Sequence, residues 1–449
     1  MSIYCAFPML PRTITEAAPL IRARRLSPVD LTEAALAAIE KDNWRLKAFL
    51  TVTAESAREA AHRATEEIRR GRYRGPLHGI PISLKDLFWT RGVRTTAGSR
   101  ILRDFVPRAD APVVVRLKNA GAVILGKTAL HEWAYGVTNN NPHFGPTRNP
   151  HDPERIPGGS SGGSAVAVAT GMGFASIGTD TGGSVRIPAS LCGVVGLKPT
   201  FGLIPVRGVI PLAPSFDHVG PLARSVEDAA LLFEVLSGKH IGDFSKGVRG
   251  LRIGIPEKFF YDCLNPEVEG AVREALRRLE ARGARLKTVE VPLVGELIPA
   301  AITVQLREAV RSHRPYRDRR REYGDAVRVL LERGETVKAS EETAARRVCT
   351  RFSRELAALF RQVDVLLTPT TPATAPLIGQ EIIEIAGQPE DIRPCLTRLV
   401  RPFNVAGVPA LSLPCGRDRR GLPIGLQVAG PKRGEALVLR AGLASEPRP

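Results

Sequence analysis

The chain has 449 residues, of which 43% are hydrophobic, and its formal net charge is +18. The apolar fraction is ample for a large core and excludes a disordered protein. No apolar run approaches the ~20 residues of a membrane span, and the N-terminus lacks the basic and apolar regions of a signal peptide. We therefore expect a cytoplasmic protein without a membrane span, and length alone favours two or three domains.

The cysteines and the basic residues both have ordinary interpretations. Six cysteines, from Cys5 to Cys415, are scattered without a CxxC pair or a metal-ligand spacing, which indicates reduced packing residues. Much of the positive charge lies in runs such as RSHRPYRDRRR at residues 311–321, in a segment that reads as helical. A nucleic-acid partner would fit such an excess, but a solvated, arginine-rich helix face is the preferred interpretation.

Helices and strands alternate along the predicted chain. Ser27 is expected to cap a helix that Pro28 begins, with an apolar stripe that includes Leu31, Ala35 and Ile39. A second helix is expected at residues 54–70, a short apolar strand within 75–86, a helix at 113–118 and a buried strand at 122–125. Later strands are expected at 251–255, 287–291, 363–370, 408–413 and 424–428, with helices at 266–282 and over most of 299–360. This alternation predicts an α/β layered fold.

Two stretches match known motifs, a phosphate loop and a nucleophile elbow, but the residues around them do not fit either motif. The run GAVILGKT at residues 121–128 fits the phosphate-loop pattern, but its intervening residues form the predicted strand itself instead of a loop around phosphate. The run GGSSG at residues 158–162 fits the nucleophile elbow of α/β-hydrolases. That elbow requires a preceding apolar strand, whereas a polar, proline-broken loop precedes this one.

A stretch rich in glycine and serine, residues 157–188, is the most informative part of the chain. Glycine lets backbone N–H groups approach a ligand closely, and successive N–H groups in a turn favour negative charge. Ser160 and Ser184, in two such turns, indicate a nucleophile with an oxyanion hole, although two tight turns around a buried element remain the alternative. Lys85, at the end of an apolar strand, is unusual because burying an ammonium group is costly.

Three motifs together resemble the amidase signature family. They are GIPISLKD at residues 79–86, GGSSGGS at 158–164 and GTDTGGSVR at 178–186, with the family's spacing between Lys85, Ser160 and Ser184. Further similarity at residues 91–96, 196–200 and 403–410 extends the resemblance over nearly the whole chain, most closely over 70–235. The resemblance implies a single large α/β domain, residues 1–449, with a mixed many-stranded sheet between layers of helices. It overrides the two or three domains expected from length.

The resemblance also implies a Ser-Ser-Lys catalytic triad. Ser184 is the expected nucleophile, Lys85 the base, and Ser160 the bridging serine, held by a cis peptide bond. A lysine is a base only when neutral, and at its ordinary pKa of ~10.4 about one in two thousand is neutral at pH 7. Burial would lower that pKa.

The oxyanion hole is expected to consist of backbone N–H groups, from Thr181, Gly182, Gly183 and Ser184. Beside them, Asp180 and Arg186 either orient the nucleophile's loop or form a simple structural ion pair, and Ser161 is expected to shape its own loop. Trp133, Tyr135 and the asparagines at 139–141 fall where the family places pocket residues, although the aromatic side chains fit a core equally well.

The implied function is hydrolysis of a small-molecule amide to an acid and ammonia or an amine, through an acyl-serine and with no cofactor or metal. Amides, carbamates and urea-like compounds all remain possible substrates. A homodimer is also possible, and nucleic acid is not an expected partner.

One alternative is the glutamine-hydrolysing A subunit of glutamyl-tRNA(Gln) amidotransferase, which passes ammonia to its partner, but residues 201–208 and 299–360 look unlike that protein. The third hypothesis is a catalytically silent binding protein, but no triad residue is missing.

Overall fold

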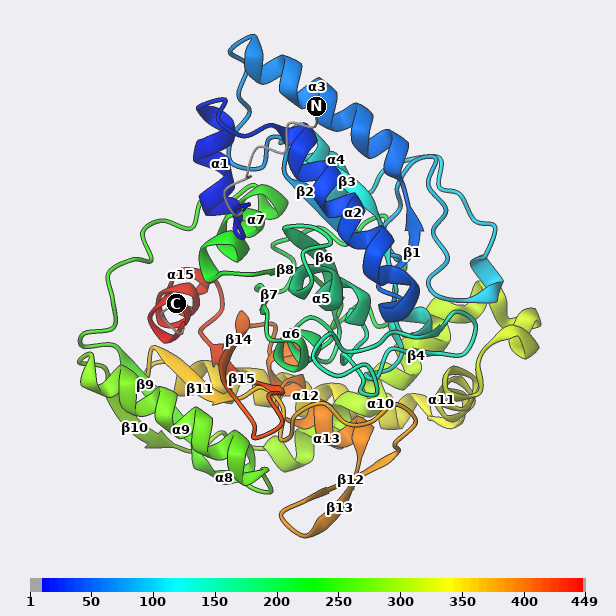
Figure 1. The fold of residues 1–449 in the computed structure, drawn as a ribbon. Helices are drawn as coiled ribbons and strands as arrows, with labels where there is room; N and C mark the ends of the chain where they lie inside the picture. The colour runs from blue at the N-terminus through cyan, green and yellow to red at the C-terminus, as the bar shows by residue number, and fades with distance from the viewer. Residues whose placement is uncertain (1–9, 447–449) are drawn as a thin grey trace.

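One mixed sheet of 11 strands organises the fold in this computed structural model, which describes residues 10–446. From edge to edge the strand order is β1-β3-β2-β6-β8-β7-β14-β15-β11-β9-β10 (Figure 1). β3, β2 and β6 form one parallel block, and β11, β9 and β10 form a second. Antiparallel pairings through β8, β7, β14 and β15 connect the two blocks. The predicted α/β fold with a mixed, many-stranded sheet in a single domain is confirmed.

The strands lie within the following bounds: β1 (Phe49–Val52), β2 (Pro81–Lys85), β3 (Val123–Thr128), β4 (Asn140–Asn141), β5 (Gly145–Pro146), β6 (Ala175–Asp180), β7 (Val195–Lys198), β8 (His218–Ala223), β9 (Arg252–Pro256), β10 (Arg285–Val289), β11 (Val365–Pro369), β12 (Ile382–Ile385), β13 (Gln388–Asp391), β14 (Ala410–Arg417) and β15 (Pro423–Ala429). The pairs β4-β5 and β12-β13 form two small separate sheets. The second of them projects from the body of the molecule (Figure 1).

The helices lie within the following bounds: α1 (Ile14–Arg22), α2 (Pro28–Leu46), α3 (Ala54–Arg69), α4 (Pro112–Asn119), α5 (Gly162–Ala169), α6 (Arg186–Cys192), α7 (Val226–Ser237), α8 (Glu257–Phe260), α9 (Pro266–Ala281), α10 (Val294–His313), α11 (Asp325–Thr336), α12 (Ala339–Leu359), α13 (Ile392–Arg398), α14 (Arg401–Val405) and α15 (Glu435–Ser445). Short 3₁₀ segments are η1 (Arg100–Leu102), η2 (Glu132–Ala134) and η3 (Arg314–Glu322).

The predicted caps form as the sequence indicates. The Ser27 hydroxyl accepts a hydrogen bond from the Val29 N–H at the start of α2, and Asn265 caps α9 in the same way. A side-chain oxygen at this position satisfies one of the backbone donors that a helix leaves open at its first turn. Three predicted strands start two residues away from the observed ones: β10 begins at residue 285 instead of 287, β11 at 365 instead of 363, and β14 at 410 instead of 408.

Small side chains let the helix α5 lie close to the sheet. Ala165, Val166 and Val168 are fully buried in one hydrophobic cluster with Leu222 of β8. A separate, larger cluster contains Ile177 of β6 together with α7. Because side chains alternate across a strand, these clusters cover the two faces of the central strands. The sheet centre is therefore buried on both sides, and polar groups there need internal partners.

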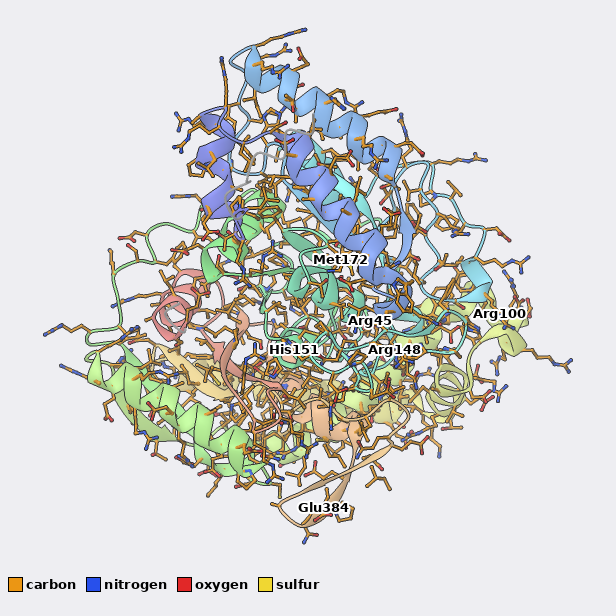
Figure 2. All side chains as sticks on the ribbon, in the orientation of Figure 1. Arg45, Arg100, Arg148, His151, Met172 and Glu384 are labelled. Atoms are coloured by element: carbon orange, nitrogen blue, oxygen red, sulfur yellow. The ribbon has the colours of Figure 1, made fainter. Side chains whose placement is uncertain are left out.

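The arginine-rich run lies at the surface, as expected. Every arginine of the run at residues 311–321 is exposed, at the end of α10 and in η3. Figure 2 shows Arg100 and Glu384 at the periphery of the molecule. The cysteines within the described residues are free and mostly buried, whereas Cys5 lies outside those residues. No helix within residues 10–446 combines the length and the apolar character needed to cross a membrane.

Candidate active site

Lys85 ends β2, the third strand from one edge of the sheet, and all five residues of that strand are buried. Its Nζ lies 2.8 Å from the Ser160 Oγ, 3.0 Å from the Ser161 Oγ and 2.8 Å from the Thr179 Oγ1. All of these partners are uncharged hydroxyl groups. The amine is therefore held in place by hydroxyl groups, and no carboxylate of residues 10–446 contacts it and favours its charged form.

This environment lowers the pKa of Lys85 to about 7. Burial is the main cause, because it disfavours the ammonium form, and the more distant carboxylates of Asp180 and Asp217 act in the opposite direction. A lysine with such a pKa is neutral in a large fraction of molecules near pH 7. It can then accept a proton through its nitrogen lone pair while its two N–H bonds donate.

The first glycine-serine turn brings Ser160 and Ser161 to this amine. The Gly159–Ser160 peptide bond is cis, as the resemblance implies, and the Ser160 carbonyl accepts a hydrogen bond from the His131 N–H. The Ser161 hydroxyl donates to the Thr179 carbonyl, so its proton is already engaged. The Ser161 Oγ thus accepts from Lys85 and ties the turn to strand β6, consistent with a loop-shaping group.

The second turn carries Ser184 between β6 and α6. Its carbonyl accepts from the Ser161 N–H at 3.2 Å, which joins the two turns. Ser184 keeps 6% of its surface exposed, whereas Lys85 and Ser160 have none. Gly183 has a φ of 114°, and a Cβ there would clash with Val400 and Ile187. Only glycine fits at that position without strain.

A buried ion pair fixes the shape of this second turn. The Asp180 carboxylate accepts from the backbone N–H groups of Gly183, at 2.8 Å, and Val185, at 3.1 Å. Arg186 contacts both oxygens of the same carboxylate at 3.0 Å, and both side chains are fully buried. Burial alone would raise the pKa of Asp180, but Arg186 and the hydrogen bonds hold it far below its usual value. The sequence left open whether Asp180 and Arg186 orient the loop or form a structural ion pair. In the structure they form an ion pair that also orients the loop.

The backbone donors of the turn are unequally available. The Gly183 N–H is already bonded to Asp180. Within the described residues, no protein group accepts a hydrogen bond from the N–H of Thr181, Gly182 or Ser184. The Thr181 hydroxyl donates to Asp217 at 2.6 Å, which anchors the start of this donor set.

Of the two contacts that the expected proton relay needs, the structure shows one. Lys85 and Ser160 are in hydrogen-bond contact, but in the described part of the chain the Ser160 and Ser184 hydroxyls do not bond to each other. The two serines are linked through the backbone bond between Ser161 and Ser184. Catalytic contacts are often long before substrate binds, so this geometry is compatible with a relay that closes on the substrate.

Residues 121–128 do not form a phosphate loop. Gly126, Lys127 and Thr128 belong to strand β3, and Lys127 is fully buried. Its Nζ forms an ion pair with Asp86 at 3.2 Å and donates to the Phe88 carbonyl at 2.8 Å. This lysine therefore stabilises the strand next to Lys85 instead of facing a ligand.

The candidate pocket residues divide into two kinds. The Asn141 amide donates to the Gly98 carbonyl, and the Asn139 amide donates to Thr147, so both support neighbouring loops. Trp133 and Tyr135 are almost fully buried, yet the Trp133 Nε1 and the Tyr135 hydroxyl have no hydrogen-bond partner within residues 10–446. An unpartnered buried hydroxyl is unusual in a protein core.

Sequence reasoning missed several residues around the site. Thr179 was inside a recognised motif but was given no role, and its neighbour Asp180 could have drawn attention to it. In the C-terminal part of the chain, the stretch at residues 403–410 supports the resemblance but indicates no role for any single residue. The structure shows that Arg186 donates there to the side chains of Asn404, at 2.7 Å, and Gln427, at 2.6 Å.

Comparison with known proteins shows which family this chain resembles. The family model described as Amidase matches residues 30–439. An amidase of Pseudomonas putida is 42% identical over 97% of this chain and 95% of its own length. From Lachnospira eligens, the A subunit of glutamyl-tRNA(Gln) amidotransferase is 38% identical over 98% of both chains. A crystal structure of an amidase superimposes with a TM-score of 0.91 at 40% identity, covering 96% of this chain and 98% of the other.

Proposed function

The chain belongs to the amidase signature family and is an amidohydrolase, and from this premise we propose that it works as a free-standing amidase with Ser184 as its nucleophile. The observation that carries the proposal is the fully buried Lys85 amine, which contacts the Ser160 hydroxyl at 2.8 Å and, within the described residues, no carboxylate. A serine hydroxyl is a weak nucleophile until a neighbouring base accepts its proton. Lys85, with its lowered pKa, is suited to be that base.

The reaction follows from the placement of these groups. Ser160 passes its proton to Lys85 and accepts the proton of Ser184, whose oxygen attacks the amide carbon. The carbonyl oxygen becomes negative and accepts hydrogen bonds from the open N–H groups of the second turn, and such a donor is worth about 3 kcal/mol. The C–N bond then breaks as the nitrogen receives a proton from Lys85 through Ser160. Water next hydrolyses the acyl-Ser184 ester by the same proton path in reverse.

The second candidate is the glutamine-hydrolysing component of the amidotransferase. The 38% identity to such a protein favours it, as does the net charge of +18. That function requires glutamine as the donor and a partner that uses the released ammonia. Against it, the P. putida amidase is slightly more similar to this chain.

A turnover assay on the isolated chain separates the two functions. We expect release of ammonia from simple amides without ATP, tRNA or a second protein, and none from the Ser184→Ala variant. Strong preference for glutamine, together with a rate that rises only when partner proteins and charged tRNA are added, would overturn the free-standing function. RNA binding would then weaken steeply with salt, because counterions are released from the phosphates.

The remaining expectations belong to the same proposal. We place the amidase domain at residues 1–449, with the signature core at about 70–235, because the sheet uses strands from β1 to β15. We also propose a cytoplasmic location, no nucleic-acid partner and an open choice between monomer and homodimer. Light scattering of the purified chain, with and without added RNA, tests the last two points.

A further inference from the structure

Two arginines near the nucleophile's loop have no acidic partner among residues 10–446. Arg401, the first residue of α14, is only 4% exposed, and its Nη1 donates to the side-chain oxygen of Gln305. Its Nε is buried without a partner in the described part of the chain. Arg393 of α13 makes no side-chain hydrogen bond and no ion pair with any residue between 10 and 446. Arg186, by contrast, is fully paired with Asp180.

Both guanidinium groups adjoin the site. A Cβ placed on Gly182 would lie 3.3 Å from the guanidinium carbon of Arg401, so this side chain packs directly against the loop of the nucleophile. The guanidinium of Arg393 lies 5.0 Å above the ring of Tyr135. The Tyr135 hydroxyl is itself buried and without a partner in this part of the molecule. Arg401 thus lies beside the open N–H groups, and the charges of both Arg401 and Arg393 act on Tyr135, so the three polar side chains lie near one another.

Two positive charges near each other are unfavourable, and here Arg401 is buried and Arg393 half-buried. Burial lowers the pKa of Arg401 to about 10, and the positive charge of Arg393 acts in the same direction. Arg333, on the exposed surface of α11, adds a third positive charge near Arg393 and Tyr135. Buried charges are normally paired, and an uncompensated one is strongly destabilising. An anion held between these groups would remove the imbalance.

We propose that Arg401 and Arg393, with the hydroxyl of Tyr135, bind a carboxylate of the substrate. The arginine fork matches a carboxylate in two-point contacts, and a buried tyrosine hydroxyl adds a neutral donor. Because Arg401 packs against Gly182, this carboxylate lies only a few bonds from the scissile carbonyl. The preferred substrates are then monoamides of short dicarboxylic acids. This inference rests on the proposed function, since it takes the Ser184 loop as the acylation site.

Matched substrate pairs test the inference. Malonamate, succinamate and glutaramate each have a neutral counterpart of the same length, namely propionamide, butyramide and pentanamide. For at least one pair we expect kcat/KM to favour the acid amide by about 10- to 100-fold, as a charge-assisted contact implies. High salt should reduce the preference by screening the charges. Equal kcat/KM values within all three pairs would overturn the inference.

Variants then locate the preference. Arg401→Met and Arg393→Met should each lower the ratio of acid-amide to neutral-amide kcat/KM by about tenfold or more, mainly through KM. Arg401→Lys keeps the charge but not the fork and should restore part of the ratio. The control Arg63→Met removes an exposed arginine of α3, paired only with Glu59, and should leave the ratio unchanged. If Arg401→Met instead lowers kcat equally for both kinds of amide, Arg401 acts on the loop or the oxyanion, and the inference fails.

A binding measurement distinguishes failure of this inference from failure of the proposed function. In the Ser184→Ala background, succinamate should raise the melting temperature, whereas butyramide at the same concentration should not. Adding Arg401→Met or Arg393→Met should abolish the shift. If succinamate binds in this way but the wild-type chain hydrolyses no amide, the carboxylate site stands and the proposed function falls. If amides are hydrolysed but neither succinamate nor succinate shifts the melting temperature, the carboxylate site falls alone.

Discussion

The carboxylate of Asp180 and the guanidinium of Arg186 meet through two hydrogen bonds of 3.0 Å in the fully buried centre of the molecule. The same carboxylate receives the Gly183 N–H. One ion pair therefore sets the backbone of the turn that presents Ser184, and charge and geometry cannot be altered separately there.

Breaking this pair should affect both stability and rate. Arg186→Met leaves the Asp180 charge buried and unpaired, which should cost about 3–5 kcal/mol in free energy of unfolding. Asp180→Asn should lower kcat about 100-fold or more, because the turn loses its charged anchor. The double variant should be less destabilised than the sum of the two single changes. Additive changes in urea unfolding would contradict a direct coupling between the two residues.

Removal of the proposed nucleophile should separate activity from folding. Ser184→Ala should reduce turnover to near the uncatalysed background, while the melting temperature stays close to that of the wild type. A fluorophosphonate probe should label the wild-type chain at Ser184. Labelling that persists in the variant would show that another serine is the nucleophile.

Activity should depend on pH through Lys85. Its pKa is lowered to about 7, and only the neutral amine accepts a proton, so the rate should fall as pH decreases through 7. Each further unit of acid should reduce the rate about tenfold, because the neutral fraction falls by that factor. The measurement is kcat/KM between pH 5 and 9. An optimum near pH 5 would be incompatible with a lysine base.

Histidine should not replace Lys85 in this role. His131 lies next to the site, where its backbone N–H donates a hydrogen bond to the Ser160 carbonyl. Burial lowers the pKa of its side chain to about 3, and the positive charges of Arg393 and Lys85 act in the same direction. It therefore stays neutral across the assay range, and His131→Asn should leave the midpoint of the pH profile in place. His143, His151 and His218 should be dispensable for the chemistry in the same way. A histidine variant as inactive as Ser184→Ala would point to a Ser-His mechanism instead.

The contact between Lys85 and Ser160 could be anticipated because its signals are local in the sequence. An ammonium group at the end of an apolar strand and serines in glycine-rich turns are each unusual for a physical reason that one sequence reveals. Arg401 gave no such signal. Arginine normally lies on the surface, and only the packing of α14 against Gly182 shows that this side chain is buried.

Some elements of the fold could likewise be predicted from the sequence, and others could not. The long amphipathic helices α2 and α9 follow from their periodicity and caps. Strands β6, β7 and β8 are rich in glycine and small residues, are buried on both faces and carry no alternation that would reveal them. The strand order, with β14 and β15 inserted between β7 and β11, depends on contacts between distant segments. No local pattern contains that information.

The partners of Arg186 have a consequence for how the protein is made. Its guanidinium donates to the Val400 carbonyl and to side chains at positions 404 and 427, far along the chain from Arg186 itself. A ribosome-bound chain that lacks these residues cannot complete the anchor of the turn that presents Ser184, however well its first half has folded. We therefore expect hydrolytic activity only after residue 427 has been synthesised. A chain split in the loop between α7 and β9 should yield two inert pieces that regain activity only when mixed.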